Sequence, residues 1–216
     1  MRTIVAALLV LMLGGIAVYA QTDGFAVLTT ESARRTRIAQ QPLDLPAAHV
    51  QSAHGDSQVL ATNLAKDGRV AIVNFMFTRC TSVCIQMGDE FQQLQEAIKE
   101  RGLQDKVRLI SISFDPRDTP DWLGRYHKRM RTDESVWQAM LASHDQERRG
   151  LLEAFGIIVV PAPLGQFEHN TAYHVVTPDG RLTRIVDIDN PDIVLHYAAT
   201  QAGWQPGGSP AGKGAS

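Results

Sequence analysis

The hydrophobic pattern predicts two buried strands with a helix between them. Residues 70–77 (VAIVNFMF) form a short, almost wholly apolar run, which is typical of a strand buried on both faces of a sheet. Residues 83–99 then carry apolar side chains at helical spacing, and Gly102 follows as a helix end. A second strand is expected over residues 107–114 (VRLISISF).

The rest of the apolar pattern predicts three more helices and a hairpin. The helices are expected over residues 119–130, 145–155 and 190–201. Residues 171–177 and 181–187 flank the turn Pro178-Asp179-Gly180, which is typical of a β-hairpin. This order of elements predicts an α/β fold that is thioredoxin-like, with a central mixed sheet flanked by helices.

An N-terminal hydrophobic segment precedes this pattern. Residues 4–20 contain no charged side chain and follow a basic start, which is typical of a signal peptide or a short membrane anchor. As a helix the segment would span about 26 Å, close to the hydrocarbon thickness of a membrane. Arg2 is expected on the cytoplasmic side, so we expect the rest of the chain in the periplasm, exported or anchored in the inner membrane. Disulfides can form in that compartment.

Composition changes along the chain predict four regions. Residues 1–20 are the signal peptide or anchor, and residues 21–65 are a polar tether with an irregular or short-strand extension. The thioredoxin-like domain is expected over residues 66–205. Residues 206–216 are rich in Gly, Pro and Ser, which predicts a disordered tail.

Charge and cysteine content exclude several classes of protein. The chain has 21 basic and 23 acidic residues, which gives a net charge of −2 without runs of either sign. Broad nucleic-acid binding is therefore not expected. Two cysteines are too few for a disulfide-rich scaffold or a four-cysteine zinc site.

The two cysteines are the strongest candidate functional residues. Cys80 and Cys84 lie between the first predicted strand and the first helix, where a helix N-terminus stabilises thiolates. Four residues apart on a helical turn, their Cα atoms would be roughly 6 Å apart, which suits either a disulfide or one shared metal ion. Two thiolates favour soft ions, Cu(I) above all and also Zn(II), and such an ion needs a third donor.

His169 is the expected third donor. The loop 161–170 delivers it just ahead of the strand at Thr171, and in a thioredoxin-like fold this loop faces the N-terminus of the first helix. The other histidines are expected in the polar N-terminal stretch (His49, His54), on solvated helices or loops (His127, His144), packed in a strand or on the surface (His174) and within a helix (His196).

Two aspartates follow the second predicted strand. Asp115 either ends that strand or supports the site, because metal-ligating histidines commonly donate their second N–H to a carboxylate. Asp118, together with Thr119, is expected to cap the helix that follows.

Three motifs resemble the Sco/SenC family of copper-binding, thioredoxin-fold proteins over about residues 66–188. They are residues 73–84 (VNFMFTRCTSVC), residues 111–120 (SISFDPRDTP), and His169 ahead of Pro178-Asp179-Gly180. The resemblance implies that Cys80, Cys84 and His169 bind copper as Cu(I), and as Cu(II) with an added oxygen donor. It also implies a metallochaperone that delivers copper to, or prepares, the binuclear copper site of cytochrome c oxidase. The partner would be the oxidase copper subunit or another extracytoplasmic copper client.

Several positions depart from the family pattern. Thr81 and Ile85 follow the two cysteines where the family usually has proline, and Glu168 replaces an aspartate before the histidine. The ligand atoms are unchanged, whereas loop stiffness and redox potential are affected. Besides a chaperone, the residues fit an enzyme, a thiol–disulfide oxidoreductase that keeps a client's copper-ligand cysteines reduced. They also fit a redox or copper sensor. The alternative is that Cys80 and Cys84 form a disulfide with a purely structural role.

Overall fold

The computed structural model describes residues 10–15, 30–80 and 83–204, and the chain divides into two compact units, 1–41 and 42–216. In the first unit, residues 10–15 are helical and α2 covers Thr30–Gln40, within the expected tether. Most of the predicted N-terminal segment 1–20, and all of the predicted tail 206–216, lie outside the described residues. Within the described ranges, no helix has both the length and the apolar character that a membrane crossing requires.

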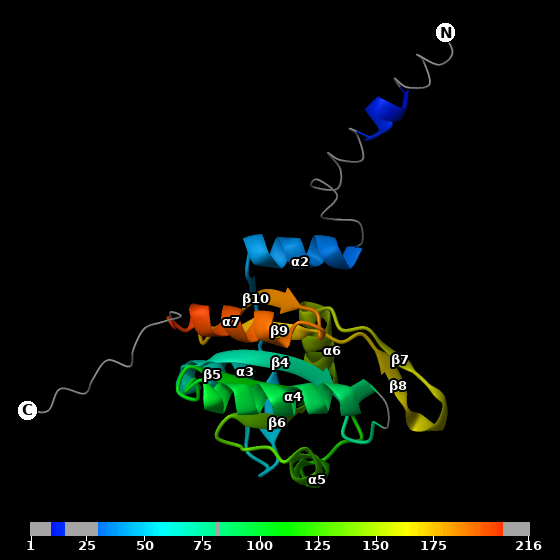
Figure 1. Ribbon diagram of the computed structural model, residues 1–216. Coiled ribbons are helices and arrows are strands. Elements are labelled where there is room, and N and C mark those ends of the chain that lie inside the picture. The colour runs from blue at the N-terminus through cyan, green and yellow to red at the C-terminus, as the bar shows by residue number, and fades with distance from the viewer. Residues whose placement is uncertain (1–9, 16–29, 81–82, 205–216) are drawn as a thin grey trace, which may run out of the picture. The chain divides into compact units, whose positions relative to one another are not determined.

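In the described part of the second unit, eight strands form one sheet in the order β1-β10-β9-β4-β5-β6-β2-β3 (Figure 1). These strands are β1 (Leu43–Asp44), β2 (His49–Ser52), β3 (Ser57–Val59), β4 (Val70–Met76), β5 (Val107–Ser113), β6 (Trp137–Ala142), β9 (Tyr173–Val176) and β10 (Arg181–Val186). The helices are α3 (Leu60–Asp67), α4 (Val83–Glu100), α5 (Pro120–Met130), α6 (Asp145–Phe155) and α7 (Pro191–Gln201). A separate hairpin pairs β7 (Val159–Pro161) with β8 (Phe167–His169) around the 3-10 turn η1 (Pro163–Gly165).

Helices cover both faces of the sheet. Tyr173 and His174 are neighbours in β9, so their side chains point to opposite faces. Tyr173 stacks on Phe91 of α4, whereas His174 meets Phe155 of α6 edge-on. α4 and α6 therefore lie on opposite faces, and α7 lies beside α4 (Figure 1). A central mixed sheet flanked by helices confirms the architecture that the sequence predicts as thioredoxin-like.

The central strands set the position of the candidate site. β4 pairs in parallel with β5, β5 pairs in parallel with β6, and β9 is antiparallel to β4. All seven residues of β4 and of β5 are buried, as their apolar runs predict. Because β4, β5 and β6 run the same way, the connections that follow them all lie at the C-terminal end of these strands.

Several elements go beyond the pattern of the sequence. β6 has no regular alternation of apolar and polar residues, and it is specified by pairing with β5 on one side and β2 on the other. Residues 42–65, within the expected N-terminal extension, contribute β1, β2, β3 and the start of α3 to the second unit. The β7–β8 hairpin arises within the stretch that the sequence describes only as a loop.

The central strand β5 buries a charge. Arg108 is 1% exposed, and its guanidinium lies 3.2 Å from the carboxylate of Asp67 and donates to Asn63 Oδ1 at 2.6 Å. Burial lowers the pKa of Arg108 to about 10, although the negative charge of Asp67 acts to raise it. The side chain therefore stays cationic at neutral pH and depends on Asp67 for compensation.

Replacing Asp67 should be strongly destabilising. We expect D67A to lower the free energy of unfolding by about 3–5 kcal/mol, because it leaves a buried cation without its partner. The control is D192A, which removes the solvent-exposed ion pair of Asp192 with Arg101 and should cost less than about 1 kcal/mol. Urea unfolding measures both variants. Equal losses would contradict the assigned role of the Arg108–Asp67 pair.

Candidate functional site

The cysteine loop, which we define as residues 77–80, follows β4 directly. Phe77 is fully buried, Cys80 is 5% exposed, and the Cys80 N–H donates to the Phe77 carbonyl at 3.3 Å. α4 starts at Val83, so Cys84 lies in its first turn, with a side chain outside the described part of the structure. Both cysteines are therefore at a helix N-terminus, where unpaired backbone N–H groups stabilise thiolates.

His169 reaches the same region from the β7–β8 hairpin. Its half-buried imidazole packs against an aromatic wall, with ring centroids 4.9 Å from Phe114 and 6.5 Å from Phe77. Phe167 contacts the same two phenylalanines edge-on. The structure thus brings His169 to the residue that opens the cysteine loop.

The imidazole of His169 is neutral, with its proton on Nδ1. Burial lowers the pKa of His169 below its usual value, and this outweighs the hydrogen bond with Asn170 and the charge interaction with Cys80, which both act to raise it. Nδ1 lies 3.0 Å from the Asn170 carbonyl oxygen, and since a carbonyl only accepts, Nδ1 carries the proton. The neutral ring then presents Nε2 as its lone-pair donor.

The carboxylate of Asp118 fixes the start of the cysteine loop. It accepts three hydrogen bonds, from Thr78 N at 2.8 Å, Thr78 Oγ1 at 2.6 Å and Ser113 Oγ at 2.6 Å. The Thr78 carbonyl in turn accepts from Arg129 Nη2 at 2.7 Å. The expected helix cap is confirmed for Thr119, which is the N-cap and accepts from the backbone of α5, and is wrong for Asp118, which is buried and accepts from Thr78.

Asp115 is the centre of an ion-pair cluster. Its carboxylate accepts from Arg117 Nε and Nη2, both at 2.8 Å, and from Arg79 Nη2 at 3.0 Å. Burial alone would raise the pKa of Asp115, but Arg117 and Arg79 hold it below the usual value. The hydrogen bonds described for Asp115 thus hold Arg79 and Arg117 in place. One of the two expected roles of Asp115 is to accept from a ligating histidine, but the Nδ1 of His169 pairs with the Asn170 carbonyl.

Arg117 also attaches the hairpin to this cluster. Its Nη2 donates to the Gly165 carbonyl at 2.7 Å, and its guanidinium lies 5.1 Å over the ring of Phe167. Gln166 Nε2 adds a longer bond to the Arg79 carbonyl, at 3.4 Å. Gly165 has a φ of +70°, and a Cβ there would meet Arg117 at 2.8 Å, so this turn requires glycine. The chain that carries His169 is thereby fixed to the cysteine loop.

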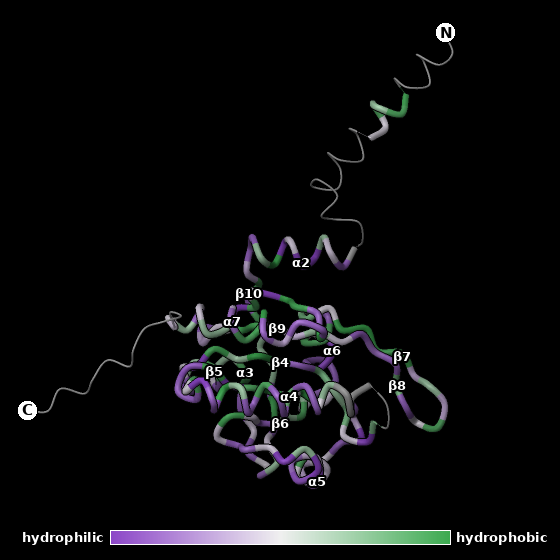
Figure 2. Tube along the Cα trace, viewed as in Figure 1, coloured by the Kyte–Doolittle hydropathy of each residue, from purple (hydrophilic) through white to green (hydrophobic). Residues whose placement is uncertain are grey.

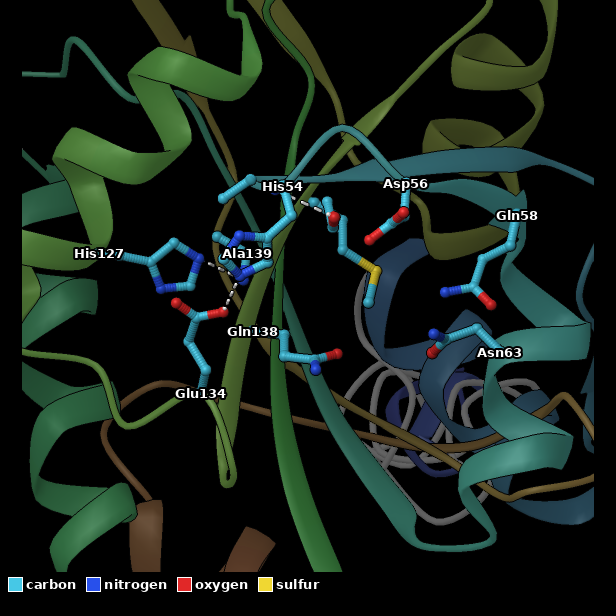
Figure 3. Close-up of a pocket in the computed structure, with 11 residues that line it drawn as sticks. His54, Asp56, Gln58, Asn63, His127, Glu134, Gln138 and Ala139 are labelled. Atoms are coloured by element: carbon cyan, nitrogen blue, oxygen red, sulfur yellow. Dashed lines mark hydrogen bonds and ion pairs between the residues drawn. The ribbon is translucent and has the colours of Figure 1, made fainter.

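Two other histidines are buried away from this cluster. His174 lies with both ring nitrogens near backbone carbonyls, as expected for a packed residue. His127, expected in solvent, is 8% exposed, because it falls on the buried face of α5. It lines a cavity of about 140 Å³ with His54 and Glu134, which pair at 2.8 Å (Figure 3). This cavity lies among β2, β3, α3, α5 and β6.

Removing the Asp118 carboxylate should release the cysteine loop. D118A leaves three buried donors unsatisfied, so we expect a loss of roughly 3 kcal/mol in the free energy of unfolding. In a C84S background, alkylation of Cys80 by iodoacetamide should become at least about tenfold faster, because the loop opens more readily.

The control is D121A, which removes an exposed carboxylate at the start of α5. If D118A does not fold, D118N retains the shape of the side chain and loses its charge. A folded Asp118 variant that alkylates at the parent rate would show that the carboxylate does not hold the loop.

Comparison with known proteins identifies relatives over most of this domain. The model of the SCO1/SenC family matches residues 53–201. A SCO1 protein homolog of Bacillus subtilis (strain 168) is 28% identical over 120 residues, which cover 54% of this chain and 61% of the relative. The match therefore spans less than two thirds of that relative's length.

Two solved structures illustrate the shared fold. The structure of BsSco, described as a member of the Sco family of cytochrome c oxidase assembly proteins with a disulfide switch, has a TM-score of 0.64 at 24% identity, over 76% of this chain and 96% of that one. Arabidopsis thaliana ScoI with copper bound has a TM-score of 0.61 at 18% identity, over 73% of this chain and 99% of that one. With the family match covering more than half of its residues, the chain belongs to the SCO1/SenC family.

Proposed function

We propose that the chain binds copper through Cys80, Cys84 and His169, and acts as an extracytoplasmic metallochaperone. The observation that carries this proposal is the position of His169: a hairpin from a distant part of the sequence packs its neutral imidazole against Phe114 and Phe77, and Phe77 opens the loop that contains Cys80. Family membership and the copper-bound structure of Arabidopsis ScoI support copper as the metal.

The proposed donor set suits copper. Two thiolates and one imidazole are soft donors that favour Cu(I), and an added oxygen donor would accommodate Cu(II). The helix N-terminus favours the thiolates, while burial keeps His169 neutral. Phe77, Phe114 and Phe167 form an apolar wall that limits access of water.

We propose the copper site of cytochrome c oxidase as the destination of the metal, with its copper subunit, or another extracytoplasmic copper protein, as the client. BsSco belongs to a family of oxidase assembly proteins, and the apolar segment at residues 4–20 is typical of an exported or membrane-anchored protein. The net charge of −2 provides no broad electrostatic docking, so the client would be recognised locally. An apolar surface for such recognition is present on the hairpin, where Val160 and Leu164 are exposed. The chain that leads into β7 is coloured as hydrophobic in Figure 2.

The second candidate function is a thiol–disulfide oxidoreductase acting on a client's copper-ligand cysteines. The four-residue spacing of Cys80 and Cys84 permits a disulfide, and BsSco contains a disulfide switch. The reduction potential of the pair discriminates: a potential well below about −300 mV would indicate an inert structural bridge, and a higher one an exchangeable disulfide.

Replacing His169 separates the two functions. We expect H169A to weaken Cu(I) binding at least about 100-fold, because it removes a metal donor, and to leave the rate of disulfide exchange nearly unchanged. Competition with a Cu(I) chelator under anaerobic conditions measures the affinity. The control is H196A, which removes an exposed imidazole on α7 and should bind copper like the parent. An H169A protein with parental copper affinity would contradict the three-donor site.

A further inference from the structure

A second group of metal-ligating side chains lies outside the cysteine loop. His49 is the first residue of β2, His144 is the N-cap of α6, and Glu147 is in the first turn of α6. One donor atom from each lies within 4.8 Å of the other two. The proposed copper chemistry uses none of the three.

Backbone pairing and one side-chain contact fix this arrangement. β2 and β6 pair in antiparallel fashion, and the Ser143 N–H donates to the His49 carbonyl at 3.0 Å just beyond the paired residues. The carboxylate of Glu147 accepts from the His49 backbone N–H at 2.6 Å. The pairing therefore places His49 next to His144, and the Glu147 side chain is already fixed between them.

The distances match the separation of neighbouring donors around a small ion. His49 Nδ1 lies 3.1 Å from Glu147 Oε1, and His144 Nδ1 lies 3.2 Å from Oε2. The two imidazoles meet edge-on with centroids 5.6 Å apart. Donors about 2.1 Å from a tetrahedral ion are roughly 3.4 Å from each other, which is close to the separations of these donor atoms.

The charges of the cluster also favour a cation. Glu147 supplies a carboxylate, and a glutamate of ordinary pKa is ionised at neutral pH. The N-terminus of α6 opposes a cation, but Glu147 and Asp145 both lie in that first turn and offset it. His144 is well exposed, with 63% of its side chain accessible, which leaves room for water as a further ligand.

We propose that His49, His144 and Glu147 form a second metal site, for a divalent ion of the Cu(II), Ni(II) and Zn(II) class. Two imidazoles and a carboxylate suit such ions, and the order of affinities for divalent ions places Cu(II) first. The cysteine loop follows β4, and His144 follows β6, two strands along the sheet. Because β4, β5 and β6 are parallel, both sites lie at the C-terminal end of these strands. It contains no thiolate, which separates it chemically from the cysteine site.

The test uses the full chain with the C80S, C84S and H169A substitutions, so that its outcome does not depend on the copper site proposed above. Cu(II) is the probe, with equilibrium dialysis for stoichiometry and electron paramagnetic resonance for the donors. We expect one Cu(II) per chain with two imidazole nitrogens in its spectrum. Adding H144A should weaken this binding at least about tenfold and remove one nitrogen from the spectrum.

The matched control adds H54A, which also removes an exposed imidazole paired with a glutamate, Glu134, near the same strands. It should bind Cu(II) like the parent. E147Q keeps an acceptor for the His49 N–H and should also weaken binding, which separates loss of a ligand from loss of structure. Thermal melting without metal confirms that each variant is folded. Equal Cu(II) affinity in the parent and in H144A, or equal losses in H144A and H54A, would overturn the proposal.

Discussion

Three hydrogen bonds converge on the buried carboxylate of Asp118, and the geometry of the cysteine loop depends on them. They join Thr78, just after β4, to Ser113 at the end of β5. A buried carboxylate is costly unless its acceptor positions are satisfied, and here three donors satisfy it. The backbone before Cys80 is therefore fixed by contacts with the end of β5, although residues 77–80 belong to no helix or strand.

A second set of contacts brings the other half of the site to this loop. Asp115, two residues beyond β5, holds Arg117 and Arg79, and Arg117 continues to the turn of the β7–β8 hairpin. That turn accommodates the guanidinium because Gly165 has no side chain. The segments that carry Cys80 and His169 are thus held together at the C-terminal end of the parallel strands, although almost ninety residues of sequence separate the two side chains.

Much of the fold could be predicted from the sequence, because local pattern and tertiary burial agree there. β4, α4, α5, α6, the β9–β10 hairpin and α7 follow from apolar runs, capping residues and turn residues. β6 and β7–β8 could not be predicted, because their partners specify them. The roles of Asp118 and Arg117 depend on contacts made in space, and His127 is buried by the face of α5 that it shares with Leu123 and Tyr126. The motifs in the sequence indicate Cys80 and His169 as candidate ligands. They do not indicate the hydrogen bonds and ion pairs that position the two segments.

The proposed copper site has two sulfur donors and one nitrogen donor around a single ion. X-ray absorption on the Cu(I)-loaded protein, prepared without oxygen, reports the donors directly. Our account predicts two sulfur scatterers and one nitrogen scatterer per copper, with the nitrogen contribution lost in H169A. A spectrum with only sulfur scatterers, as from a site shared by two chains, or with an unchanged nitrogen contribution in H169A, would contradict it.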